Sequence, residues 1–205
     1  MSNKKSILFM TTLAILISIE IIISTTTLGS LPAIGPIVMT VAHIPVIIGA
    51  VVLGFKGGII MGFVYGLLSF LVWTFAPSSP VAFLFTPFYS VGQISGNFWS
   101  LIICFVPRIL LGILSYLFIK VLFRPFNSKF LSNFVGAALA NIISSGLLLF
   151  FVYIFFRGEY ATVLGIEYKA VKGVILLTIV TSSIPESILG GAVTLGVDKL
   201  FRSKK

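Results

Sequence analysis

Charged side chains are scarce in this sequence, and acidic ones are the scarcest. Only 9% of the 205 residues are charged, 14 of them Lys or Arg and 5 Asp or Glu, while 58% are hydrophobic. A soluble domain could not bury so much apolar surface, so the composition indicates several membrane-spanning helices. The net charge of +9 needs no nucleic-acid partner, because most basic residues stand in short connections between apolar runs.

Cysteine and histidine are nearly absent. Cys104 is the only cysteine, which excludes an internal disulfide, and His43 is the only histidine, which cannot build a metal site alone. The phosphate-loop, nucleophile-elbow and zinc-protease motifs are missing as well. We therefore expect a protein that is not an enzyme and that carries no metal and no cofactor of its own.

Long apolar runs predict an all-α membrane bundle of six helices, forming one domain over residues 1–205. A helix needs about 20 apolar residues to cross the hydrocarbon layer. The runs that fit are residues 6–24, 40–54, 57–75, 98–122, 130–155 and 171–200. A tight turn near Gly54 separates the short second run from the third. The first run carries Glu20 and is followed by no clear cleavage site, so we interpret it as a retained helix and not a signal peptide.

The basic residues define an orientation. If the N-terminus is cytoplasmic, ten Lys and Arg residues lie inside and three lie outside, as the positive-inside rule requires. Six spans then leave both termini in the cytoplasm.

Two of the outer loops contain no charged residue. Thr25 to Met39 and Ala76 to Gly96 are rich in Pro, Gly and Ser and still carry large apolar side chains. Irregular backbone at membrane depth is tolerated where protein buries it or where it lines a cavity. We expect these re-entrant loops to fold over the bundle as lids, and we expect the charged loop Arg157 to Lys169 to face solvent.

Arg108 lies in the middle of an otherwise apolar run. An arginine at mid-bilayer costs about 2.5 to 3.5 kcal/mol on insertion scales, so it marks a partner, a cavity or a ligand. Helical spacing places it on one polar stripe with five other residues. These are Asn97, Ser100, Cys104, Gly112 and Ser115.

Two interpretations of Arg108 are open. Glu186 lies near the middle of the last run, on a stripe with Thr178 and Ser182, so the two charges could pair and only fix helix register. Alternatively, the guanidinium binds a ligand carboxylate with two parallel donors. Asn141, which both donates and accepts, would then bind a hydroxyl or amide of the same ligand.

Further residues near the outer side are candidates for the binding site. Aromatic side chains of the uncharged loops and their flanks could form an apolar wall, although such residues also anchor helices at the membrane interface. His43 could cap or pack its helix, or touch the ligand. The candidates beside Arg108, Asn141 and Glu186 are Trp73, Phe88, Tyr89, Asn97 and His43.

Small residues recur every four positions on the second and third runs. Gly58, Gly62 and Gly66 let another helix approach closely, and Ala50 and Gly54 repeat the spacing. They indicate either packing within the bundle or a docking face for another membrane protein.

Three segments carry a resemblance to a known family. They are AHIPVIIGA at 42–50, LGFKGG at 53–58 and VPRIL at 106–110. With the six-helix pattern, they resemble the substrate-binding S component of energy-coupling factor (ECF) vitamin transporters, and within that family the pantothenate-specific type.

The resemblance implies a transport mechanism. Such S components capture a vitamin outside, associate with a transmembrane coupling protein and two cytoplasmic ATPases, and topple to carry the site inward. Family members often dock through an Ala-x-x-x-Ala motif on the first helix, where this chain has Ala14 and Ser18. The alternatives are another small vitamin or precursor, such as a hydroxymethylpyrimidine or pyridoxine, and a membrane enzyme or assembly factor in which Arg108 and Glu186 only pair.

Overall fold

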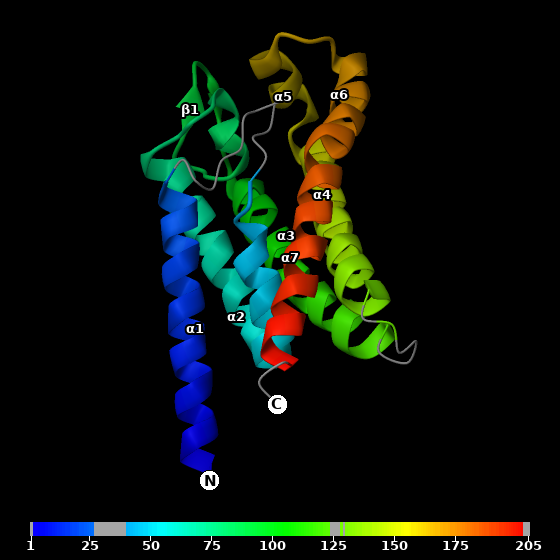
Figure 1. The fold of residues 1–205 in the computed structure, drawn as a ribbon. Helices are drawn as coiled ribbons and strands as arrows, with labels where there is room; N and C mark the ends of the chain where they lie inside the picture. Colours follow the sequence, from blue (N-terminus) through cyan, green and yellow to red (C-terminus); the bar gives the residue numbers. More distant parts are fainter. Residues whose placement is uncertain (1, 27–39, 124–127, 129, 203–205) are drawn as a thin grey trace.

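The chain folds into a bundle of long helices with a small cap at one end (Figure 1). The computed structural model describes residues 2–26, 40–123, 128 and 130–202. Its α-helices are α1 (Ser2–Thr25), α2 (His43–Phe75), α3 (Phe98–Tyr116), α4 (Gly136–Phe155), α5 (Arg157–Leu164), α6 (Val171–Thr178) and α7 (Ile184–Arg202). Within these described ranges, five helices are long and apolar enough to cross a membrane. The predicted all-α membrane bundle is confirmed.

Shorter elements join and extend the helices. Three π-helical turns are η3 (Leu117–Leu122), η5 (Phe130–Val135) and η7 (Ile179–Ser183), and η7 connects α6 to α7. Two 3-10 turns are η2 (Pro80–Leu84) and η6 (Tyr168–Ala170). The strands β1 (Ser90–Val91) and β2 (Ile94–Ser95) pair antiparallel, with Ser90 opposite Ser95.

Helix α2 is folded back on itself. Gly54 has φ 77° and ψ −162° inside it, a left-handed conformation that glycine adopts at little cost. The two arms then pack against each other, with Gly49 beside Met61 and Ala50 beside Gly58. The predicted turn is therefore confirmed, and α2 contains the two helical runs expected on either side of it.

The glycine ladder of α2 packs against α3. A Cβ on Gly58 would lie 2.6 Å from the Gly112 carbonyl oxygen, and one on Gly62 would lie 2.5 Å from the Arg108 carbonyl oxygen. A Cβ on Gly66 would lie 2.9 Å from the Phe105 ring. Because α3 occupies this surface, the ladder serves packing within the chain.

The uncharged segment 76–96, which we call the cap, lies over one end of the bundle. Val81, Phe83, Leu84 and Phe85 are buried, and the Ser100 hydroxyl donates to the Phe83 carbonyl (2.7 Å). The cap therefore folds back onto the helices as expected. The other predicted lid is residues 25–39, of which 27–39 lie outside the described residues.

The segment Arg157 to Lys169 faces solvent only in part. Its first half forms α5, where Tyr160 and Ala161 are buried in one hydrophobic cluster with Val81 and Phe83 of the cap. Seven of its 13 residues are exposed, as expected, and the buried side of α5 closes the cap. The cap and α5 lie at one end of the bundle, and the start of α1 and the end of α7 lie toward the other (Figure 1).

Candidate ligand-binding cavity

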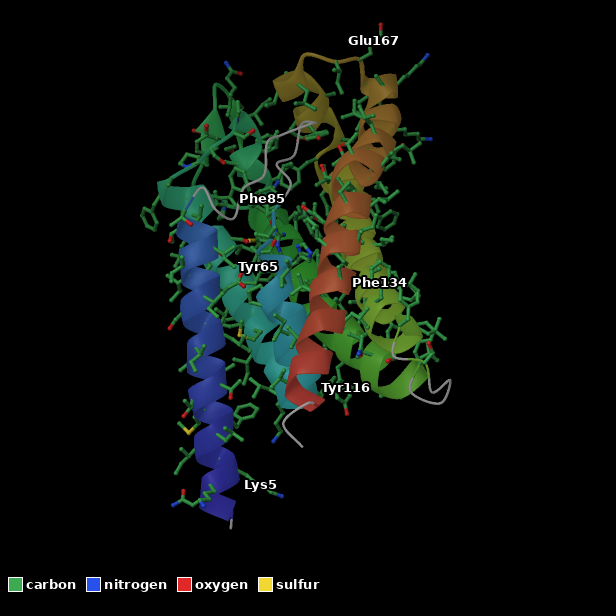
Figure 2. All side chains as sticks on the ribbon, viewed as in Figure 1. Lys5, Tyr65, Phe85, Tyr116, Phe134 and Glu167 are labelled. Atoms are coloured by element: carbon green, nitrogen blue, oxygen red, sulfur yellow. The ribbon has the colours of Figure 1, made fainter. Side chains whose placement is uncertain are left out.

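A cavity of about 170 Å³ lies among α1, α2, α3, α4 and the continuous run of α6, η7 and α7, with the cap residue Phe85 on its wall. Five of the eight predicted binding residues line it. They are His43, Trp73, Arg108, Asn141 and Glu186. Figure 2 shows Phe85 and Tyr65, both wall residues, along the middle of the bundle, between Glu167 at the cap end and Tyr116 at the opposite end.

Arg108 is the cationic group of the cavity. Its side chain is 7% exposed, and Nη1 donates to the Ile103 carbonyl oxygen (2.7 Å). The guanidinium carbon lies 4.9 Å from the ring centroid of Phe85 and 5.6 Å from that of Tyr65, within the range of cation–π attraction. One carbonyl cannot satisfy five N–H donors, so the guanidinium has donors to offer a ligand.

The polar face predicted for α3 is confirmed. Ser100, Cys104, Arg108 and Ser115 are all buried. The pattern of polar residues every three to four positions therefore placed this side of the helix correctly toward the bundle interior.

Glu186 faces the same cavity from α7, yet it forms no ion pair with Arg108 among the described residues. Its Oε1 accepts a hydrogen bond from the Thr40 amide (2.7 Å). Asn141 lies beside this carboxylate and donates from Nδ2 to the Ser187 hydroxyl (3.1 Å). The Glu186 carboxylate thus contacts α4 and the chain that enters α2. Arg108 is hydrogen-bonded elsewhere, to the Ile103 carbonyl.

His43 makes structural contacts at the cavity edge. It is 3% exposed; Nδ1 lies 3.0 Å from the Thr40 carbonyl oxygen and Nε2 lies 2.9 Å from that of Glu186. Gly190 packs against the same ring. The imidazole therefore joins the start of α2 to α7, and its ring also lines the cavity.

Several wall residues were not among the predicted binding residues. Tyr65 and Ser69 follow Gly62 at helical spacing on the inner face of α2, which is the signal that could have identified them. Ser182 and Ser183 both reach the cavity from η7. Ser144 and Ser145 of α4 are likewise consecutive and line the same cavity. Serine is common on helices, so the residue type alone did not identify these positions.

Three predicted residues do not line the cavity. Asn97 caps α3: its Oδ1 accepts from the Trp99 amide (2.9 Å), and its own amide donates to Ser100 Oγ (3.1 Å). Phe88 is 75% exposed, and Tyr89 packs against the hydrophobic cluster between the cap and α5. Sequence proximity to the outer end did not separate residues of the cap surface from residues of the cavity wall.

The predicted docking residues divide into two groups. Ala14 and Ser18 are exposed on α1, where the Ser18 hydroxyl donates to the Ala14 carbonyl (2.9 Å). Ala50 is fully buried between the arms of α2, and Gly54 forms the turn that joins them. The first pair is fully on the surface, Gly54 is half-buried and Ala50 is buried.

Fold and site together define a multi-pass membrane protein with a cavity among its helices. Residues 8–197 match the family described as ECF transporter, substrate-specific component. The chain belongs to this family, whose members are the substrate-binding components of transporters. It is similar to the pantothenic acid transporter PanT of Lactococcus lactis subsp. cremoris (strain MG1363), with 36% identity over 160 residues, covering 73% of this chain and 76% of that protein.

Proposed function

We propose that this protein is the pantothenate-binding subunit of an ATP-driven ECF importer in the bacterial cell membrane. The observation that carries the proposal is the buried guanidinium of Arg108 on the wall of a cavity among the helices. A buried cation needs a counter-charge, and Arg108 contacts no carboxylate among the described residues. A ligand carboxylate would supply that contact.

The rest of the cavity suits the other end of pantothenate, which has hydroxyls and an amide. Neutral hydrogen-bonding groups line the cavity from α4, α6 and η7, namely Asn141, Thr178 and Ser182. Such groups orient a polar ligand in a mostly apolar pocket. The carboxylate would bind the N–H donors of Arg108, and the hydroxyls would point toward Asn141.

Topology and partners are part of the proposal. With α2 contributing two spans, the chain crosses the membrane six times, both termini are cytoplasmic, and the cap faces outside, where the vitamin arrives. The cap acts as a lid over the bound vitamin. The chain has no phosphate loop, so ATP is used by two cytoplasmic ATPases, and a transmembrane coupling protein docks at Ala14 and Ser18.

Binding of radiolabelled pantothenate to the purified full chain tests the proposal. We expect saturable binding that unlabelled pantothenate displaces and that hydroxymethylpyrimidine and pyridoxine do not. Displacement by either of those compounds, with no binding of pantothenate, would assign the site to another vitamin. Absence of binding by all three would favour a membrane enzyme or assembly factor.

A further inference from the structure

The cavity holds one arginine and one carboxylate that do not touch. Arg108 on α3 and Glu186 on α7 both line it, and each is hydrogen-bonded to backbone: the guanidinium to the Ile103 carbonyl and the carboxylate to the Thr40 amide. Their charges therefore balance across the cavity without a direct bond. A carboxylate ligand that binds Arg108 would add a second negative charge to the cavity.

Other titratable groups pack around Glu186. From α1, Glu20 is fully buried; its Oε1 accepts from Ser24, and its Oε2 has no partner among the described residues. From α2 come the Tyr65 phenol and the His43 imidazole, whose two ring nitrogens both lie on carbonyl oxygens. Because a neutral imidazole has one N–H, His43 is the competing proton site that the variants below separate from Glu186. From α3, Cys104 is a buried thiol whose sulfur contacts the Gly66 carbonyl.

We propose that Glu186 is a proton-binding site that is filled when an anionic ligand is captured. The ligand carboxylate takes the place of Glu186 as the counter-charge of Arg108, and one proton from solvent joins the Glu186 carboxylate. The net charge of the cavity is then unchanged on binding. As a neutral acid, Glu186 still accepts from the Thr40 amide and gains an O–H that can be donated to a ligand hydroxyl. This inference rests on the proposed capture of pantothenate.

Calorimetry in pairs of buffers with different ionisation enthalpies counts the protons taken up per ligand bound. It is performed on the full chain between about pH 5.5 and 9, where a free carboxylate stays ionised. We expect uptake to approach one proton per pantothenate at the upper end, with affinity falling up to about tenfold per pH unit there. Pantothenol, the alcohol analogue without the carboxylate, should bind with no uptake.

Glu186→Gln is the matched variant, because its side-chain oxygen can still accept from the Thr40 amide and its melting temperature reports on the fold. We expect it to bind pantothenate with no proton uptake and with an affinity that does not change with pH. The proposal is overturned if wild type takes up no proton at any pH, if pantothenol gives the same uptake, or if uptake persists in Glu186→Gln and vanishes in His43→Gln. Failure of pantothenate to bind at all would instead contradict the proposed function.

Discussion

The guanidinium of Arg108 lies over the ring of Phe85, 4.9 Å from its centroid. This contact joins the middle of a membrane-spanning helix to the cap, two parts of the chain that are 23 residues apart in sequence. It places an aromatic wall directly beside the group that we propose as the carboxylate anchor. The cap therefore has a part in the site as well as covering it.

Replacing Phe85 by Ala removes that wall. We expect pantothenate affinity to fall about tenfold, since a desolvated cation–π contact and the lost packing contribute about 1 to 2 kcal/mol together. Isothermal titration calorimetry on the purified chain measures this affinity. Phe88→Ala is the control, because Phe88 is 75% exposed and does not line the cavity; an equal loss in both variants would mean that Phe85 acts only through the stability of the cap.

Gly62→Ala tests the close packing of α2 on α3. The new Cβ would meet the Arg108 carbonyl oxygen at 2.5 Å, so the helices must separate at the level of the anchor. We expect the variant to be destabilised by about 1 to 3 kcal/mol and to bind ligand more weakly. Gly146→Ala, where no atom lies within 4 Å of the new Cβ, should melt like wild type; a Gly62→Ala protein that does the same would contradict this packing.

Tyr160 gives the protein a sensitivity to alkaline pH outside the membrane-spanning helices. Burial raises the pKa of Tyr160 to about 12, from a usual value near 10. Because the folded state favours the neutral phenol, this contribution to stability is complete below about pH 10 and is lost as the pH rises toward 12. The hydroxyl has no partner among the described residues. Tyr160→Phe should melt at or above the wild-type temperature at pH 7 and lose less stability near pH 10.5; a variant that melts well below wild type at pH 7 would reveal a partner for the hydroxyl.

Ser18→Trp tests docking through α1. Ser18 and Ala14 are exposed on one face of this helix, and a bulky side chain there should block close approach by the coupling protein. We expect co-purification with an ATPase-containing complex to fail while pantothenate binding is unchanged. Ile19→Trp, also exposed but on another face, is the control. Full complex formation by Ser18→Trp would move the docking site elsewhere.

Much of the architecture could be predicted from the sequence, because the bilayer imposes a length and a polarity on each span. The all-α membrane bundle, the turn at Gly54 and the buried stripe of α3 all follow from hydropathy and helical spacing. The close approach of Gly58 and Gly62 to a neighbour was also predictable, but spacing alone could not say that the neighbour is α3 of the same chain.

The composition of the site was predictable only in part. Arg108, Asn141 and Glu186 were found because polar groups at membrane depth are costly and therefore informative. Tyr65 and Ser183 were missed, and Ser182 was placed only on the stripe of Glu186, since hydroxyl-bearing residues are common on helices. Asn97 was misplaced because a capping asparagine and a binding asparagine look alike in sequence.

The most direct test of the central claim is the affinity of Arg108→Ala for pantothenate, measured beside Arg157→Ala. Arg157 is also an arginine, but it lies at the cap end, stacks on Tyr168 and does not line the cavity. If Arg108 binds the ligand carboxylate through charge-assisted hydrogen bonds, its removal should weaken binding at least about 100-fold, while Arg157→Ala keeps wild-type affinity. A folded Arg108→Ala protein that binds pantothenate within about twofold of wild type, too small a change for a lost charged hydrogen bond, would contradict the account.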